Sequence, residues 1–179
     1  MKIFVLLFLI TSPFFCFAQN QESSTRIFID KAKYTQINKD WNTTAEFYSG
    51  INEYVFFFPI EIIDLKTKEK IKALELNMFI KNPDLYKTAW IGLDEIDEFI
   101  HFIETNVIPN LDLKFKKKSS EFIFKAKEMT FNYLVDEKRK RISISLNNYE
   151  KAGSPNFYFW TETQVSKIPE LLTVLKKMK

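Results

Sequence analysis

The chain has 179 residues, with 26 Lys and Arg against 23 Asp and Glu, and therefore a formal net charge of +3. Nineteen Phe with only three Gly and six Pro argue against a disordered or loop-dominated protein. The near balance of charges excludes a large single-sign field that would recruit nucleic acid or an anionic membrane. The composition predicts an ordinary globular domain with a phenylalanine-rich core.

The first residues, MKIFVLLFLITSPFFCFAQ, have the layout of a cleavable secretory signal. An apolar run that is too short to span a bilayer follows Lys2. Cys16 and Ala18 occupy the two small-residue positions, which predicts cleavage before Gln19. A lipoprotein signal acylated at Cys16 is the alternative, but SPFFC lacks the small residues that lead into such a cysteine. We therefore expect an exported protein, either periplasmic or extracellular.

Cleavage would remove residues 1–18 and with them the only cysteine of the chain. Thiol nucleophiles, thiolate metal sites and disulfides are then excluded from the mature protein. Residues 19–179 have the length of a single domain, which is long enough to bury a core without covalent staples. Packing alone must stabilise that domain.

The apolar pattern in the first half of this domain predicts strands followed by a helix. Residues 25–34 alternate in a strand-like way, and a polar connection follows that ends near Gly50. Residues 53–80 predict two strands around the charged turn 66–69, and Pro59 indicates an edge position or a bulge. A short strand, TAWIG, comes next, and from Asp94 the apolar period changes from two to 3.6, which predicts a helix that Pro109 ends.

Alternation returns in the second half, in LDLKFK, EFIFKAK, MTFNYLV and RISISL. The last two segments predict a hairpin whose apolar residues share one face, namely Met129, Phe131, Tyr133 and Val135 on one strand and Ile142, Ile144 and Leu146 on the other. A final strand, FYFW, precedes a last helix from about Glu162 to Lys177. The predicted class is therefore α+β, with two helices packed on antiparallel sheet.

The two halves resemble each other, which predicts duplicated strands-plus-helix units over about 25–108 and 111–179. An offset of 69 residues superposes Phe99 on Ile168 and Phe102 on Leu171. This pattern, with its GLDEIDEFIHFIE helix, is similar to a family of uncharacterised secreted bacterial α+β proteins, which implies no activity. The duplication also looks like the Whirly single-strand-binding topology, although the strands here carry no basic signature motif.

The stretch WIGLDEIDEFIHFIETN surrounds His101, the only histidine, with five carboxylates. Glu98 and His101 have the Glu-x-x-His spacing of carboxylate-bridged di-metal bundles, but the second predicted helix contains no histidine to complete such a site. On a helical wheel His101 lies opposite the apolar stripe. We therefore predict a solvated acidic helix face, with no metal and no cofactor.

Other chemistries leave little trace in the sequence. There is no G-x-S-x-G elbow, and three glycines cannot form a Walker loop or a dinucleotide fingerprint. A carboxylate-pair hydrolase remains open as an alternative, because two acids can come from anywhere in the chain. We predict no catalytic residue and a protein that is not an enzyme.

Two basic runs, KFKKK and KRKR, are the candidate binding residues, because they could hold a phosphate backbone or a polyanionic glycan. The leading prediction is an exported, non-enzymatic module that binds a partner protein or an envelope component. Polyanion or single-stranded nucleic-acid binding through the basic runs is the alternative, and export disfavours nucleic acid. The candidate residues are Lys116, Lys117, Lys118, Arg139, Lys140, Arg141 and Tyr149.

Overall fold

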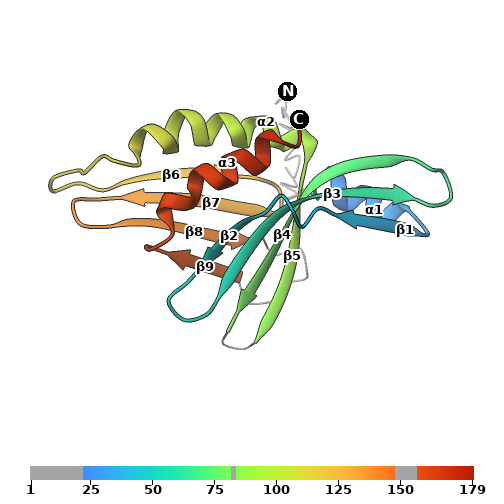
Figure 1. The fold of residues 1–179 in the computed structure, drawn as a ribbon, viewed down its shortest axis with the longest axis horizontal. Helices are drawn as coiled ribbons and strands as arrows, with labels where there is room; N and C mark the ends of the chain where they lie inside the picture. The colour runs from blue at the N-terminus through green and yellow to red at the C-terminus, as the bar shows by residue number, and fades with distance from the viewer. Residues whose placement is uncertain (1–21, 82–83, 148–156) are drawn as a thin grey trace, which may run out of the picture.

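Two antiparallel sheets, named sheet A and sheet B, divide the strands of the chain in sequence order (Figure 1). The computed structural model describes residues 22–81, 84–147 and 157–179. Sheet A contains β1 (Thr35–Lys39), β2 (Ala45–Tyr48), β3 (Tyr54–Asp64), β4 (Lys70–Ile80) and β5 (Leu85–Gly92). Sheet B contains β6 (Ser120–Lys125), β7 (Met129–Val135), β8 (Lys140–Leu146) and β9 (Phe157–Thr161).

Helices follow each sheet and also precede the first one. The α-helices of the described residues are α1 (Ser24–Lys31), α2 (Leu93–Phe102) and α3 (Ile168–Lys176). A π-helical turn, Ile103–Val107, and a 3-10 turn, Ile108–Asn110, continue α2, and a 3-10 turn, Val165–Lys167, leads into α3. None of the described helices is both long and apolar enough to cross a membrane. The α+β class is confirmed.

One large core joins both sheets to α2 and α3, which lie side by side along one face of sheet B (Figure 1). Phe99 of α2 stacks on Phe124 of β6, with ring centroids 4.6 Å apart, and contacts Phe131 of β7 edge-on. The predicted hairpin of sheet B is confirmed, since Tyr133 pairs with Ile142 and both are fully buried. Apolar alternation thus placed this core face correctly.

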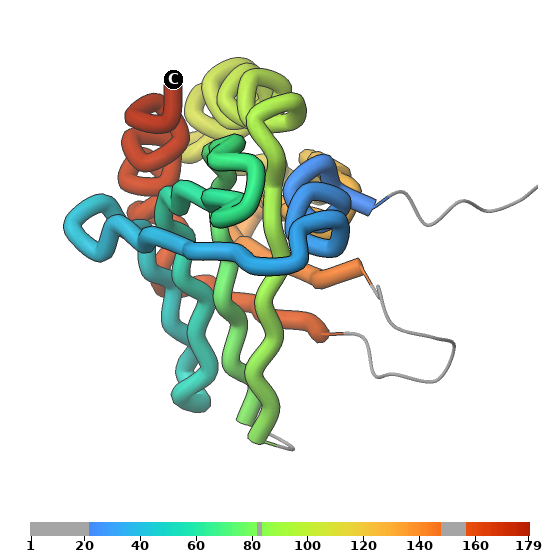
Figure 2. Tube along the Cα trace, turned by 90° about the vertical axis from the view of Figure 1, so that its right-hand side faces the viewer, coloured from blue at the N-terminus to red at the C-terminus, as the bar shows by residue number. Residues whose placement is uncertain are grey.

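Sheet A has a second apolar cluster on its other face, where α1 lies in front of it in Figure 2. Residues 25–34 were predicted as a strand, and this was wrong, because Ser24–Lys31 form α1. Ser23 caps the segment by accepting a hydrogen bond from the Arg26 amide at 3.1 Å. Phe28 and Ile29 pack against the cluster around Phe58, so burial of one helical stripe outweighs the local alternation.

The connection predicted after residue 34 contains two strands instead, because β3 is 11 residues long and needs a neighbour along its whole length. β2 pairs with its first part and β1 with its last part. Pro59 lies where the neighbour changes, and its carbonyl accepts a hydrogen bond from the Asp40 amide at 3.1 Å. The missing Pro59 N–H therefore breaks no ladder, although β3 is an interior strand and the predicted edge position is wrong.

Two further predictions were wrong at element ends. Residues 111–116 form no strand, since the 3-10 turn leaves them crossing toward β6, and Leu113 is 45% exposed with no sheet beneath it. The last helix starts at Ile168 rather than Glu162, because Pro169 sits in its first turn and fixes the start there.

Candidate functional site

The two basic runs come together at one end of sheet B. The meander places the start of β6, the end of β7 and the start of β8 at the same end, with Ser120 opposite Val135 and Val135 opposite Lys140. An open hollow of about 590 Å³ lies there, lined by residues 117–119 and 136–139. We name this surface the basic end of sheet B, after its exposed cations Lys116, Lys117, Lys118, Lys138 and Arg139.

The structure assigns other contacts to two of the candidate residues. The Nζ group of Lys140 donates a hydrogen bond to the Leu111 carbonyl, in the segment that follows the 3-10 turn. Arg141 forms an ion pair of 2.7 Å with Glu162 and stacks over the Trp160 ring, 4.6 Å from its centroid. Tyr149 lies outside the described residues. The second basic run is therefore split between the turn and the strand that follows it.

A different surface was not predicted as a site: a row of five aromatic rings across the outer face of sheet A. β2 contributes Tyr48, β3 Tyr54 and Phe56, β4 Phe79 and β5 Tyr86. Tyr54 stacks between Phe56 and Phe79, at centroid distances of 4.6 and 5.2 Å, and Phe79 lies 4.7 Å from Tyr86. We name these residues the aromatic band. Tyr86 is 70% exposed and Tyr48 39% exposed.

The aromatic band lies on the half of sheet A that α1 and β1 leave bare. In Figure 2 these two elements cover the upper part of the sheet, and no described element lies in front of its lower part. Tyr54 stacks on Phe56 and Phe79, whereas Tyr48 and Tyr86 meet their neighbours in tilted or edge-on contacts. A hydrogen bond with Tyr86, together with partial burial, raises the pKa of Tyr54 to about 12. The band is an ordered apolar surface with polar tips.

The aromatic band extends between two edge strands of sheet A, β2 and β5. The Trp90 amide of β5 donates to the Glu128 carboxylate at 3.1 Å and therefore points away from β4. By the alternation of an antiparallel ladder, the backbone groups of Tyr86 and Thr88 point outward from the same edge. No hydrogen bond to either of these amides is found within the described residues. Within the described residues, the β5 edge beside Tyr86 therefore offers outward backbone groups to an added strand.

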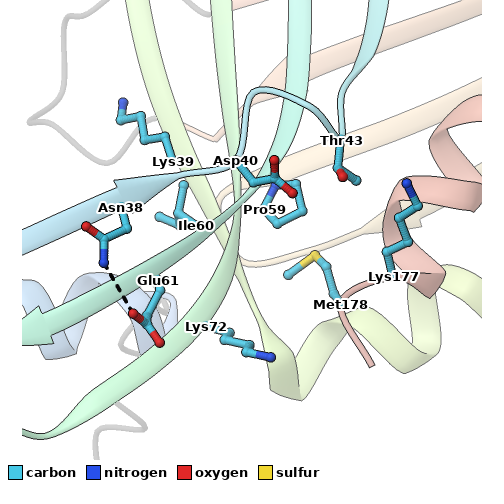
Figure 3. A pocket seen from close by; sticks show the side chains of 10 residues that line it. All are labelled: Asn38, Lys39, Asp40, Thr43, Pro59, Ile60, Glu61, Lys72, Lys177 and Met178. Atoms are coloured by element: carbon cyan, nitrogen blue, oxygen red, sulfur yellow. Dashed lines mark hydrogen bonds between the residues drawn. The ribbon is translucent and has the colours of Figure 1, made fainter.

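A groove of about 610 Å³ opens between the β1–β2 connection, the inner face of sheet A and the end of α3 (Figure 3). Pro59 and Met178 form an apolar floor, and Lys72 and Lys177 stand on its rim. The rim also carries Asp40 and Glu61, which lie apart in Figure 3, and Asn38 donates a hydrogen bond to Glu61 at 3.2 Å. The groove does not bring a carboxylate pair together, as a glycosidase would require.

The buried acids of the described residues serve to join elements. Glu128, in the turn between β6 and β7, accepts hydrogen bonds from Arg26 at 3.0 and 2.8 Å and from Ser23. Glu75 of β4 pairs with Lys39 of β1 at 2.6 Å. These carboxylates satisfy cations and amides inside the fold, which is a structural role.

Acids of α2 also bind neighbouring elements. Glu95 accepts a hydrogen bond from the Lys127 amide at 2.7 Å, and burial raises its pKa. Burial opposes ionisation of Asp94, but hydrogen bonds from Lys127 and Ser24 outweigh it and lower the pKa of that carboxyl. Gly92, the N-cap of α2, leaves room for this contact, because a Cβ there would lie 2.2 Å from Ser24 Oγ.

His101 is exposed on α2, on the polar face that the helical wheel predicted. The acids around it do not converge on it. Asp97 pairs with Lys179 at 2.7 Å and Glu104 with Lys176 at 2.5 Å, so this face holds the end of α3 against α2. Among the described residues no group of three or more His, Cys, Asp or Glu side chains is arranged to hold a metal ion.

No protein-family model matches the chain, and no curated protein matches it. The exposed surfaces of the two sheets are therefore the features that bear on function.

Proposed function

We propose that this protein is an exported, non-enzymatic binding module whose aromatic band receives an extended segment of a partner protein. The observation that carries the proposal is the continuous row of five contacting rings across β2 to β5 on a face that no described element covers. Tyrosine and phenylalanine are enriched at the centres of protein interfaces, where they bury large areas and keep a polar tip.

Ring geometry favours a protein partner over a sugar. A sugar ring stacks on an open aromatic face, whereas Tyr54 already stacks with Phe56 and with Phe79. Because the rings already hold one another in place, ordering them on binding costs little side-chain entropy. Apolar side chains of a partner can lie along the ring edges, and its polar groups can pair with the hydroxyls of Tyr48 and Tyr86.

The β5 edge supports the same mode of binding. An extended segment could add to the outward amide and carbonyl groups of Tyr86 and Thr88 while its side chains contact the band. Thr88 Oγ1 donates to Asn77 Oδ1 at 2.8 Å, which keeps this part of the outer face ordered. Main-chain hydrogen bonds would then give affinity, and the aromatic rings would give side-chain selectivity.

The test compares band variants with a matched tyrosine variant. The immobilised protein is incubated with the exported fraction of its source, and retained proteins are purified and titrated against Tyr86→Ala, Tyr48→Ala and Tyr158→Ala. Tyr158 is 48% exposed on sheet B, away from the band. For a true partner we expect each band variant to lose on the order of 30-fold in affinity, as an aromatic hot spot does, and Tyr158→Ala to lose almost none.

Two outcomes would overturn the proposal. A partner that is lost equally with Tyr158→Ala does not use the band. If the purified protein elutes as a dimer that Tyr86→Ala dissociates, the band is an interface between copies of this chain. Thr88→Pro, which removes an outward N–H, should weaken binding, whereas Thr88→Ser, which keeps both the N–H and the hydroxyl, should not; equal effects of the two would exclude strand addition at β5.

A further inference from the structure

We propose that the basic end of sheet B binds a linear polyanionic glycan that carries sulfate or phosphate groups. This site is separate from the aromatic band, which lies on sheet A. Four exposed cations line the hollow, Lys117 and Lys118 from the loop before β6 and Lys138 and Arg139 from the β7–β8 turn, against two acids, Asp136 and Glu137. The fold creates this concentration of charge, because the two segments are about twenty residues apart in sequence.

The two acids are occupied in shaping the turn. Asp136 Oδ1 accepts the amides of Lys138 and Arg139, each at 2.7 Å, and these hydrogen bonds lower the pKa of its carboxyl. Its other oxygen pairs with the Arg139 guanidinium at 3.0 Å. Glu137 accepts the Lys117 amide at 3.4 Å, which ties the loop to the turn. The acids thereby fix the position of the lysines around them.

The ammonium groups of Lys117, Lys118 and Lys138 have no ion-pair partner within the described residues. Unpaired exposed lysines on one hollow provide a positive potential that a polyanion can occupy with release of its counterions. Exposed lysines recognise negative charge and not a particular molecular shape. The expected ligand is therefore a polymer with repeating anionic groups.

A glycan fits this surface better than a single-stranded nucleic acid does. None of the residues that line the hollow, 117–119 and 136–139, is aromatic. The nearby Trp160 ring has the Arg141 guanidinium on one face, and Glu162 holds that guanidinium in place. Base stacking, which supplies much of single-strand affinity, therefore lacks a platform here. A sulfated or phosphorylated sugar polymer needs only the charges.

The chain offers a matched control in the β3–β4 turn. Asp64 Oδ1 accepts the amides of Lys66 and Thr67, as Asp136 does in the β7–β8 turn, and this turn carries three lysines with Asp64 and Glu69. Among the described residues, Lys31 of α1 is the one cation from another segment that lines the hollow beside this turn, together with Asp64 and Glu69. Replacing the lysines of the turn changes the net charge by the same amount without touching the basic end.

Heparin is the probe, and its affinity is measured at salt concentrations from about 50 to 300 mM. For Lys117→Gln/Lys118→Gln/Lys138→Gln we expect at least a tenfold loss of affinity at the lowest salt and a salt-dependence slope smaller by about two to three units. Lys66→Gln/Lys68→Gln/Lys70→Gln should stay within about twofold. All six residues are exposed, and thermal melts would check that both variants fold.

Equal losses in the two triple variants, no loss in the first, or no measurable heparin binding at the lowest salt would each overturn the proposal. An oligothymidine of equal charge distinguishes the polymer class. If it binds the wild type as tightly as heparin does and loses affinity in the first variant, the surface binds nucleic acid and the glycan assignment is wrong.

Discussion

Arg26 of α1 holds Glu128 of the β6–β7 turn through two hydrogen bonds, of 3.0 and 2.8 Å, and thereby ties the N-terminal helix to sheet B. The Glu128 side chain is 3% exposed and the Arg26 side chain 15%. The Arg26 guanidinium also lies over the Trp90 ring, 4.6 Å from its centroid. Three segments that are far apart in sequence meet at one carboxylate.

Glu128→Gln should therefore be strongly destabilising. It removes the negative charge that the guanidinium faces inside the fold, which typically costs about 3–5 kcal/mol. The free energy of unfolding is measured by denaturant titration. Glu162→Gln is the control, because its pair with Arg141 is about one-third exposed and should cost less than about 1 kcal/mol. Similar losses in the two variants would show that α1 is not anchored by Glu128.

Truncation at two positions of α2 separates core from surface. Phe99 is fully buried between Phe124 and Phe131, so Phe99→Ala should lower the free energy of unfolding by about 3–5 kcal/mol. His101 is exposed, so His101→Ala should change it by less than about 0.5 kcal/mol. A large effect of His101→Ala would mean that the histidine has a role that its contacts do not explain.

Glu95 gives the fold a pH dependence of known sign. Burial raises its folded-state pKa above the usual 4.5, so the folded state binds more protons than the unfolded state in that window. The stability that Glu95 contributes is fully present below pH 4.5 and is lost as the pH rises through the raised pKa. Melting temperatures of Glu95→Gln and wild type are compared at about pH 4 and pH 7. The melting temperature of Glu95→Gln, relative to that of wild type, should be higher at about pH 7 than at about pH 4. A higher relative melting temperature at about pH 4 would show that the pKa of Glu95 is not raised.

Tyr54 should titrate late because of Tyr86. Its raised pKa of about 12, against the usual 10.0, means that its contribution to stability is present below pH 10 and is lost as pH rises to about 12. Tyr86→Phe removes the hydrogen bond, so one tyrosine fewer should titrate near 12 when tyrosinate absorbance is followed. Tyr133, whose pKa burial raises to about 12, should stay late and serves as an internal control. An unchanged number of late tyrosines would disprove the contact.

Apolar alternation predicted the strands whose two faces differ in burial. In β7 and β8 every second residue is apolar and faces the core, and the prediction held residue by residue. The pattern failed at residues 24–31, where Ser23 supplies a cap and Phe28 finds a cluster from sheet A, neither of which local alternation can encode.

The candidate site was predictable only in part. The basic runs are visible as charge in the sequence, but their convergence depends on the β6–β7–β8 meander, and the separation of Lys140 and Arg141 from the turn depends on where β8 begins. The aromatic band was not predicted, because Phe and Tyr at strand spacing usually belong to a core. Which of the two faces of sheet A is covered depends on α2, α3 and sheet B, not on sheet A itself.

The sequence by itself determined the α+β class, the helical stripe around Phe99 and the solvent-facing side of His101, because periodicity is a local consequence of backbone geometry. Only the tertiary structure decided which aromatic residues stay exposed and which distant lysines meet. Those outcomes depend on contacts between segments that are far apart in the chain, such as Tyr48 with Phe56 and Lys117 with Glu137. Long-range packing, which no local pattern records, therefore sets both proposed binding surfaces.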